Sequence, residues 1–246
     1  PLDRIVIRAE MATETGIVEV TERLVGKGVL GVTERLQHLS GEVEVSLAQH
    51  SGSVGCIRKK LEDKELEDDE IRRIVRDIDR NSLNDIELGA YVSAIYANGL
   101  SMSETLSLTE HMTEVGETME WGDGVVADKH SIGGVAGNRV TPLVVPIVAA
   151  AGAKIPKTSS RAITSPAGTA DTVEVFCDVK FPKERIVEIV EETNGCMIWG
   201  GSVDLSPVDD RIIRAEHPLS LDPEGQVIAS VLSKKKSVGS THLVLD

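Results

Sequence analysis

The chain has few aromatic residues and no long apolar segment. Only 2% of its 246 residues are Phe, Trp or Tyr, too few for the stacked side chains that hold single-stranded nucleic acid. The longest apolar run, from Val140 to Ala153, contains Pro142 and Pro146 and is shorter than the ~18 residues that suggest a membrane span. We therefore predict no nucleic-acid partner and no membrane partner.

Basic residues and cysteines are also scarce. The 26 Lys and Arg residues face 40 Asp and Glu residues, a net charge of −14, whereas nucleic acid and anionic lipid need a basic surface. Cys56, Cys177 and Cys196 form no CxxC pair, which indicates a reducing, cytoplasmic location. Apart from His130, the histidines lack HxH or HExxH spacing, and we predict no metal site.

The first 50 residues are predicted to form a small β-rich domain. Three segments alternate apolar and polar residues as strands do: Asp3–Arg8, Gly16–Thr21 and Gly41–Ser46. The chain starts without Met and ends in the strand-like segment Thr241–Asp246. We expect it to be truncated, with the β domain and the last domain both partial.

Residues 51–118 are predicted to form a helical domain, to which residues 207–238 return. A helix that follows the acidic stretch Glu67–Glu70 carries four apolar residues at helical spacing: Ile71, Ile74, Val75 and Ile78. A second apolar stripe over Leu88–Tyr96 precedes Gly99, a residue typical of helix ends.

Ser101 and Glu104 have the spacing of a capping box, in which each residue bonds the backbone N–H of the other and starts a third helix. The apolar stripes of these helices exceed what one small domain buries. We therefore predict a homodimer or a larger homo-oligomer.

Residues 119–206 and 239–246 are predicted to form a partial α/β domain with a mainly parallel sheet. A short strand at Val125–Ala127 leads into the glycine-rich stretch Asp128–Arg139, then into an apolar helix that ends near Gly152, then into a strand at Ile155. The order strand, loop, helix, strand is typical of parallel α/β folds.

The glycine-rich stretch has the composition of an anion-binding loop. Glycines between a strand and a helix let backbone N–H groups approach a phosphate, and Lys129 and Ser131 add a charge and a hydroxyl donor. The spacing fits neither the Walker A loop nor GxGxxG. Phosphate binding is favoured over the alternative, a tight turn with a solvated lysine.

Two further segments carry polar side chains that suit a ligand. The stretch Thr158–Thr169 combines hydroxyls with an arginine, which suits phosphate; the alternative is a loop whose hydroxyls cap local turns. Ser230 and Lys234 share one face of a helix. Its buried face is predicted from four other residues: Val227, Ile228, Val231 and Leu232.

Together these motifs resemble one enzyme family. Asp128–Val135 is similar to the phosphate loop of the thymidine/pyrimidine nucleoside phosphorylase superfamily. Ser160–Thr169, Pro218–Gly225 and Ile228–Lys235 are more similar to its archaeal AMP phosphorylase branch. The resemblance runs from about Gly41 to the end and implies an α/β fold of the type II nucleoside phosphorylase kind, with a chain close to half the usual length.

The resemblance implies phosphorolysis within nucleotide salvage. A nucleoside 5′-monophosphate (AMP, also CMP and UMP) and phosphate, the co-substrate, give free base and ribose 1,5-bisphosphate without a cofactor. One alternative is a thymidine or pyrimidine nucleoside phosphorylase. Another, of a different class, is a non-catalytic phosphate-binding or oligomerisation module.

The resemblance also implies roles for single residues. Asp222 is the proton donor of the leaving base, and His130 is the alternative acid because imidazole has the better intrinsic pKa. The phosphate ligands are Lys129, Ser131, Ser159 and Thr169. The nucleotide site comprises Gly134, Ser160, Arg161, Ala162, Ile163, Thr164, Ser165, Thr169 and Ser230. Arg214 and Lys234 contact the base.

Overall fold

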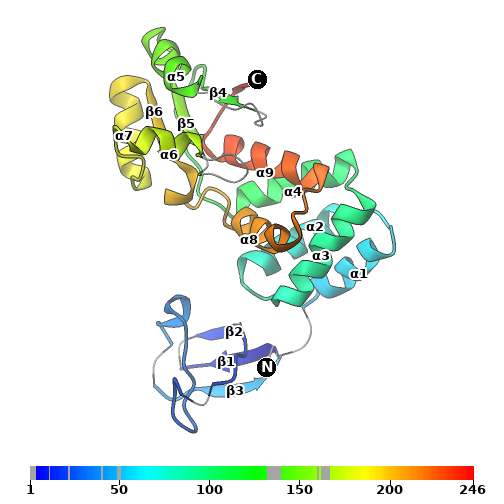
Figure 1. Cartoon of the computed structure of the whole chain (residues 1–246). Helices are drawn as coiled ribbons and strands as arrows, with labels where there is room; N and C mark the ends of the chain where they lie inside the picture. Colours follow the sequence, from blue (N-terminus) through cyan, green and yellow to red (C-terminus); the bar gives the residue numbers. More distant parts are fainter. Residues whose placement is uncertain are drawn as a thin grey trace. The chain divides into compact units, whose positions relative to one another are not determined.

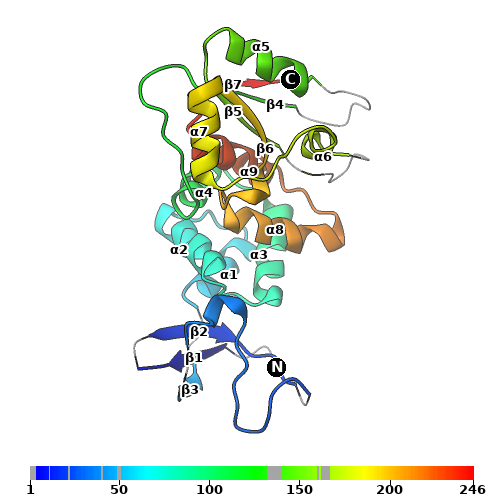
Figure 2. The same cartoon turned by 90° about the vertical axis from the view of Figure 1, so that its left-hand side faces the viewer.

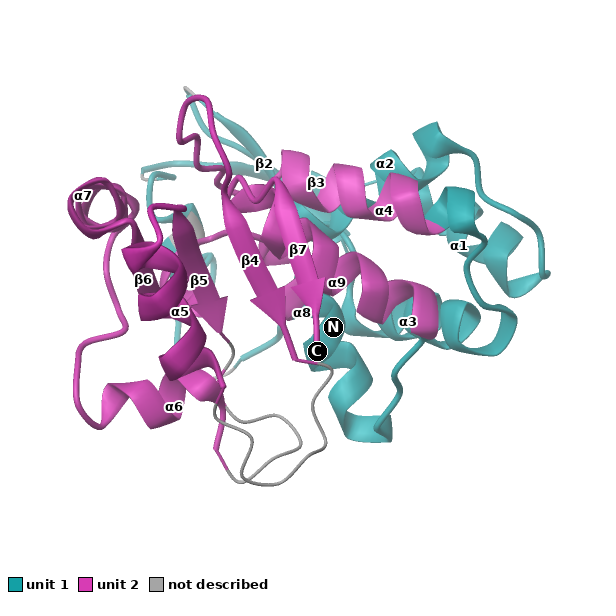
Figure 3. Cartoon of the chain, turned by 90° about the horizontal axis from the view of Figure 1, so that it is seen from above, with its two compact units in different colours: residues 1–104, 211–223 teal, residues 105–210, 224–246 magenta. Residues whose placement is uncertain are grey.

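The computed structural model describes residues 4–10, 12–21, 23–39, 41–48, 51–131, 140–159, 161 and 167–246, shown from two sides in Figure 1 and Figure 2. The chain forms two compact units, coloured separately in Figure 3. Unit 1 comprises residues 1–104 and 211–223, and unit 2 comprises residues 105–210 and 224–246.

Unit 1 begins with a three-stranded antiparallel sheet in the order β2-β1-β3. Its strands are β1 (Arg4–Arg8), β2 (Thr13–Ile17) and β3 (Glu44–Leu47). The second strand was predicted at Gly16–Thr21, which begins three residues after β2 does. The third was predicted at Gly41–Ser46, which begins three residues before β3 does. Their bounds follow from pairing with β1, which sets Ile17 opposite Arg4 and Glu44 opposite Arg8, and such a register is not visible in a single strand's pattern.

The helices of unit 1 follow the predicted apolar spacing. They are α1 (Ser53–Leu61), α2 (Asp68–Asp79) and α3 (Asp85–Asn98), and α1 packs against both others. The four apolar residues predicted for α2 are all 0–1% exposed, a burial that contributes about 1.5–3 kcal/mol for each large side chain. Negative charge at the start of α2 (Asp68, Asp69 and Glu70) favours that end of the helix.

The predicted helix ends are confirmed, and one residue of the second stripe was placed wrongly. α3 ends at Gly99, whose φ of 67° favours glycine. α4 (Met102–Glu114) starts with the predicted capping box: Glu104 N donates to Ser101 Oγ at 3.1 Å, and Ser101 N donates to Glu104 Oε2 at 2.8 Å. Tyr96, at the end of the predicted stripe, is exposed.

Unit 2 contains parallel strands, as predicted. They are β4 (Ala127–His130), β5 (Ile155–Ser159), β6 (Gly195–Trp199) and β7 (His242–Leu245). β4 pairs with β7 and β5 pairs with β6, and a parallel bridge from Val126 to Lys154 joins the pairs, which gives the order β7-β4-β5-β6 visible in Figure 3. The α/β prediction is thereby confirmed.

β4 differs from its predicted bounds in a way that matters for the site. Asp128, Lys129 and His130 were predicted to lie in a loop, and instead they lie on the strand. Their pairing with β7, in which Asp128 is opposite Leu243 and Lys129 opposite Val244, extends the strand across polar residues. Long-range pairing thus overrides the local pattern.

The helices of unit 2 complete the core around the sheet. They are α5 (Thr141–Ala150), α6 (Thr169–Glu174), α7 (Lys183–Thr193) and α9 (Glu224–Ser237), while α4 and α8 (Pro207–Glu216) are divided between the two units. Short 3₁₀ turns lie at Glu34–Leu36, Gly200–Ser202 and His217–Leu219. Ile186 and Val190 of α7 pack with Ile198 of β6 and Val238 in one buried cluster.

The predicted buried face of α9 was wrong. Val227, Ile228 and Leu232 are 44%, 39% and 38% exposed. The buried positions of the helix are Gly225, Gln226, Ala229, Ser233, Lys235 and Ser237. Most of their polar groups have partners in unit 2: Lys235 pairs with Asp128, Ser237 donates to Leu205 O, and Gln226 Nε2 donates to Asp209, whereas Gln226 Oε1 is buried without a partner among the described residues. A buried polar face is stable only with such partners, which the sequence of the helix does not reveal.

Candidate anion-binding site

The carboxyl ends of the parallel strands bring several predicted residues to one edge of the sheet. β4 ends at His130 and is followed by Ser131, β5 ends at Ser159, and β7 is followed by Asp246. In parallel α/β sheets, ligands bind in the crevice at this edge. Thr169 is the first residue of α6, and its side chain is half-buried.

Lys129 and Ser131 form a small set of donors that holds an oxyanion. Lys129 is buried, and its Nζ lies 2.7 Å from Ser131 Oγ and 3.0 Å from Asp246 Oδ2. Hydrogen bonds from Lys129 and Ser131 lower the pKa of the Asp246 carboxyl. An ammonium and a hydroxyl on one carboxylate are the donor types that also bind phosphate.

Ser159 offers an unused donor at the same edge. Its Oγ is buried and has no hydrogen-bond partner among the residues that the structure describes. A buried hydroxyl without a partner costs free energy. A bound oxyanion that accepts its hydrogen bond would remove that cost.

Arg161 is engaged by protein groups. Its Nη1 lies 2.7 Å from both Asp171 and Glu174, and its guanidinium lies 4.8 Å from the centre of the Trp199 ring. Hydrogen bonds to Glu174 and Asp171 raise the pKa of Arg161. In this arrangement Arg161 contacts α6 and the end of β6.

Buried charges lie beneath this edge. Asp128 pairs with Lys235 at 2.9 Å, and both side chains are buried. Lys157 of β5 is also buried and donates a hydrogen bond to Thr158 O. Desolvation and, to a smaller extent, the charge of Lys235 lower the pKa of Lys157 to about 7. Burial and neighbouring lysines, Lys235 first, lower the pKa of His130 to about 4.

We therefore expect His130 to stay neutral at physiological pH, because protonating it would add a charge to a buried site that already holds three lysines. NMR of the imidazole ring, assigned with a His130→Asn variant, should show no titration between about pH 5.5 and about pH 8. A midpoint near the ordinary value of 6.5 would contradict this expectation.

Ser230 and Lys234 converge on one buried carboxylate. Ser230 Oγ donates to Asp209 Oδ2 at 2.8 Å, and Lys234 Nζ lies 2.6 Å from the same atom. Gln226 Nε2 donates to Asp209 Oδ1 at 3.1 Å. The shared helix face predicted for Ser230 and Lys234 is thus present, with Asp209 at its centre.

The remaining predicted residues lie in unit 1 or outside the described part of the chain. Arg214 and Asp222 belong to unit 1, and both are exposed. Six residues lie outside the described part of the chain: Gly134, Ser160, Ala162, Ile163, Thr164 and Ser165.

Sequence reasoning missed three buried charged residues, one of which, Asp209, bonds two of the predicted site residues. Lys157, Asp209 and Lys235 contact their partners through elements far apart in the chain. The signal available for Lys157 was its position two residues before Ser159 on a strand, which puts both side chains on one face. Nothing comparable marked Asp209.

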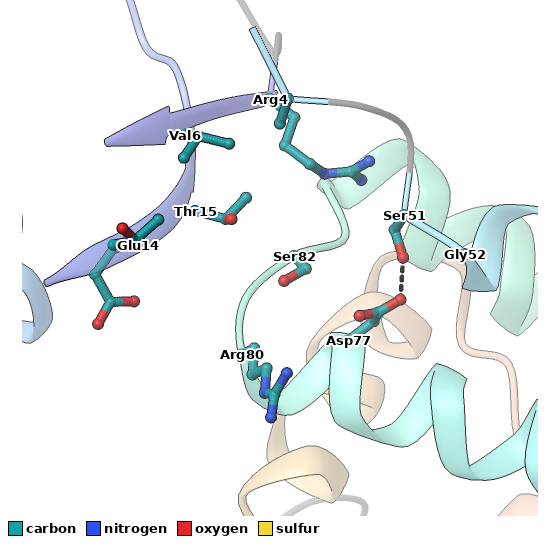
Figure 4. Close-up of a pocket in the computed structure, with 11 residues that line it drawn as sticks. Arg4, Val6, Glu14, Thr15, Ser51, Gly52, Asp77, Arg80 and Ser82 are labelled. Atoms are coloured by element: carbon teal, nitrogen blue, oxygen red, sulfur yellow. Dashed lines mark hydrogen bonds between the residues drawn. The ribbon is translucent and has the colours of Figure 1, made fainter. Parts of the chain in front are cut away.

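A separate cavity of about 520 Å³ lies in unit 1 (Figure 4). Its lining carries both signs of charge, with Arg4 and Arg80 beside Glu14 and Asp77, and Ser51 donates to Asp77. None of the predicted site residues lines it. The candidate site is therefore the edge of the sheet in unit 2.

Among the described residues, no group of three or more His, Cys, Asp and Glu side chains is placed to hold a metal ion. In the same part of the chain, no helix is both long and apolar enough to cross a membrane.

Two family models match the chain. Residues 54–116 match the model described as "Glycosyl transferase family, helical bundle domain", and residues 123–216 match "Glycosyl transferase family, a/b domain". The first match covers α1 to α4, and the second covers β4 to α8.

Curated relatives match over the whole chain. AMP phosphorylase of Natronomonas pharaonis is 60% identical over 100% of this chain and 49% of its own length. AMP phosphorylase 1 of Archaeoglobus fulgidus is 47% identical over 99% of this chain and 49% of its own length. AMP phosphorylase of Methanococcus vannielii is 43% identical over 100% of this chain and 50% of its own length. The chain spans about half the length of these relatives.

A solved structure shares the fold. Anthranilate phosphoribosyltransferase (TrpD) from Thermus thermophilus aligns with a TM-score of 0.67 over 77% of this chain and 57% of its own, at 20% identity.

Proposed function

Because the chain belongs to the glycosyl transferase family that includes the AMP phosphorylases, we propose that it supplies the phosphate site for phosphorolysis of nucleoside 5′-monophosphates. The substrates are AMP, CMP or UMP together with phosphate, and the products are the free base and ribose 1,5-bisphosphate. The observation that carries the proposal is the carboxylate of Asp246 held by Lys129 and Ser131, since phosphate makes the same kind of contacts.

The reaction needs phosphate held against C1′ of the ribose while positive charge develops on the sugar ring. We assign that task to Lys129, Ser131, Ser159 and Thr169. The buried hydroxyl of Ser159, without a partner among the described residues, supports its assignment because it is a donor free to bind an anion. The remaining nucleotide contacts, including Arg161, Ser230 and Lys234, stay as predicted from the resemblance.

The leaving base also needs a proton. A base departs more easily as the neutral, protonated species, so a carboxylic acid next to it speeds the bond cleavage. We assign this role to Asp222 because the resemblance implies it; His130, whose pKa burial and neighbouring lysines lower to about 4, remains the alternative acid. The predicted domain boundaries, the homo-oligomer and the cytoplasmic location also remain predictions.

The proposal is tested by assaying the full-length gene product with phosphate and each of AMP, CMP, UMP, thymidine and uridine. We expect free base and a ribose bisphosphate from the nucleotides and no cleavage of the nucleosides. Cleavage of thymidine or uridine alone would contradict the proposal and favour a pyrimidine nucleoside phosphorylase. Binding of phosphate and AMP without turnover would favour a non-catalytic module.

Removing the charge of Lys129 should weaken phosphate binding. We expect Lys129→Met to lower the affinity for inorganic phosphate about 10- to 100-fold, the range of a lost charge-assisted hydrogen bond, as measured by calorimetry. Lys154→Met is the matched control, since it removes the same charge from a lysine bonded to Trp121 O and Glu191. Equal phosphate affinity in the two variants would remove Lys129 from the site.

A further inference from the structure

One buried carboxylate in unit 2 is bonded by three side chains of a neighbouring helix. Asp209, in α8, has no exposed surface. Its partners Gln226, Ser230 and Lys234 are four residues apart along α9, and residues at this spacing lie on one face of a helix.

The cluster is buried at its Gln226 end and partly exposed at its Lys234 end. Gln226 is 1% exposed, Ser230 is half-buried, and the side chain of Lys234 is 29% exposed. A carboxylate out of contact with water is stable only when its charge and lone pairs are satisfied. Lys234 supplies the opposite charge from the partly exposed end, where a ligand has access.

Asp209 also decides which hydrogen bonds remain for a ligand. A carboxylate only accepts, so the hydroxyl hydrogen of Ser230 is committed to it and the Ser230 oxygen is left as an acceptor. The ammonium of Lys234 has three donors and uses one on Asp209. Ser230 and Lys234 therefore present an acceptor and a donor one helical turn apart.

We propose that Asp209 is a positioning residue for the nucleotide: it fixes Ser230 as an acceptor and Lys234 as a donor towards the base or ribose of a nucleoside monophosphate. The inference rests on the proposed function, in which Ser230 and Lys234 contact the nucleotide. Asp209 itself is buried and acts only through these two side chains.

The test compares AMP binding and phosphate binding by calorimetry in the full-length gene product. Asp209→Asn keeps the size of the side chain, removes its charge, and introduces an amide that can donate to Ser230. We expect it to weaken AMP binding about tenfold, the effect of one lost charge-assisted hydrogen bond, and to leave phosphate affinity within about twofold. In a Ser230→Ala/Lys234→Met background, adding Asp209→Asn should change AMP affinity less than about twofold, because the groups it positions are gone.

The control is Ser237→Ala. Ser237 is equally buried on α9 and donates to Leu205 O at 2.9 Å, without contact to Asp209. We expect this variant to lose some thermal stability and to keep its AMP affinity. If Asp209→Asn fails to fold, a double variant, Asp209→Asn/Lys234→Met, removes both charges together. We expect this double variant to bind AMP more weakly than Lys234→Met alone.

The outcomes separate the two proposals. The positioning role is overturned if the unmodified protein binds AMP and Asp209→Asn binds it equally well. It is also overturned if Asp209→Asn causes the full tenfold loss in the Ser230→Ala/Lys234→Met background. Both outcomes leave the proposed function standing. Equal AMP affinity of Asp209→Asn/Lys234→Met and Lys234→Met overturns the positioning role as well. Absence of AMP binding in the unmodified protein overturns the proposed function and the inference with it.

Discussion

Replacing Asp222 by Asn is expected to lower kcat for AMP about 10²- to 10⁴-fold, the usual contribution of a general acid, while KM for AMP changes only a few-fold. Asparagine keeps the size of the side chain but has no acidic proton to give to the leaving base. Asp222 is exposed, two residues before α9, so its substitution removes no buried contact. Steady-state kinetics of the full-length gene product measure the effect.

Glu224→Gln is the matched control for this variant. Glu224 is another exposed carboxylate, the first residue of α9, and its loss changes the net charge by the same amount. We expect nearly unchanged kcat in the control. Turnover by Asp222→Asn close to that of the control would exclude Asp222 as the acid.

Replacing Glu104 by Gln is expected to lower the free energy of unfolding by about 3–5 kcal/mol, the cost of breaking a buried ion pair from one side. The side chains of Glu104 and Lys60 are 1% and 4% exposed and lie 2.9 Å apart. Glu104 also accepts hydrogen bonds from Leu66 N and Ser101 N. The amide removes the charge and leaves the Lys60 ammonium buried without its counter-charge.

Urea denaturation measures this loss, and Glu110→Gln serves as its control. Glu110 lies on the same helix, α4, and pairs with Lys236 at 3.6 Å with both side chains about half exposed. Exposed pairs contribute about 0–1 kcal/mol, so the control should be nearly as stable as the unmodified protein. A loss below about 1 kcal/mol for Glu104→Gln would show that Lys60 finds water or another partner.

Much of the helical structure was predictable because its signals are local. The spacing from Ile71 to Ile78 defines the buried face of α2, and Ser101 with Glu104 forms the capping box that starts α4. Each of these signals lies within two helical turns. No distant partner is needed to read them.

The errors arose where distant partners decide the outcome. α9 carries a row of apolar residues, including Val227 and Leu232, that the pattern placed inside. The protein buries the opposite face instead, because Asp128 and Asp209 satisfy its polar side chains. Likewise, β4 extends through Asp128 to His130 because β7 pairs with it from more than a hundred residues away.

The candidate site divides in the same way. The sequence by itself determined the parallel α/β class and marked Lys129 and Ser131 as phosphate ligands. Their contact depends on β4 continuing through Lys129, because side chains two residues apart share a face on a strand and not on a helix. Only the tertiary structure decided that burial and neighbouring lysines lower the pKa of His130, that Lys157 is buried, and that Asp209 holds Ser230 and Lys234. Burial and charge pairing depend on which distant elements pack together, and a pattern along one chain does not contain that information.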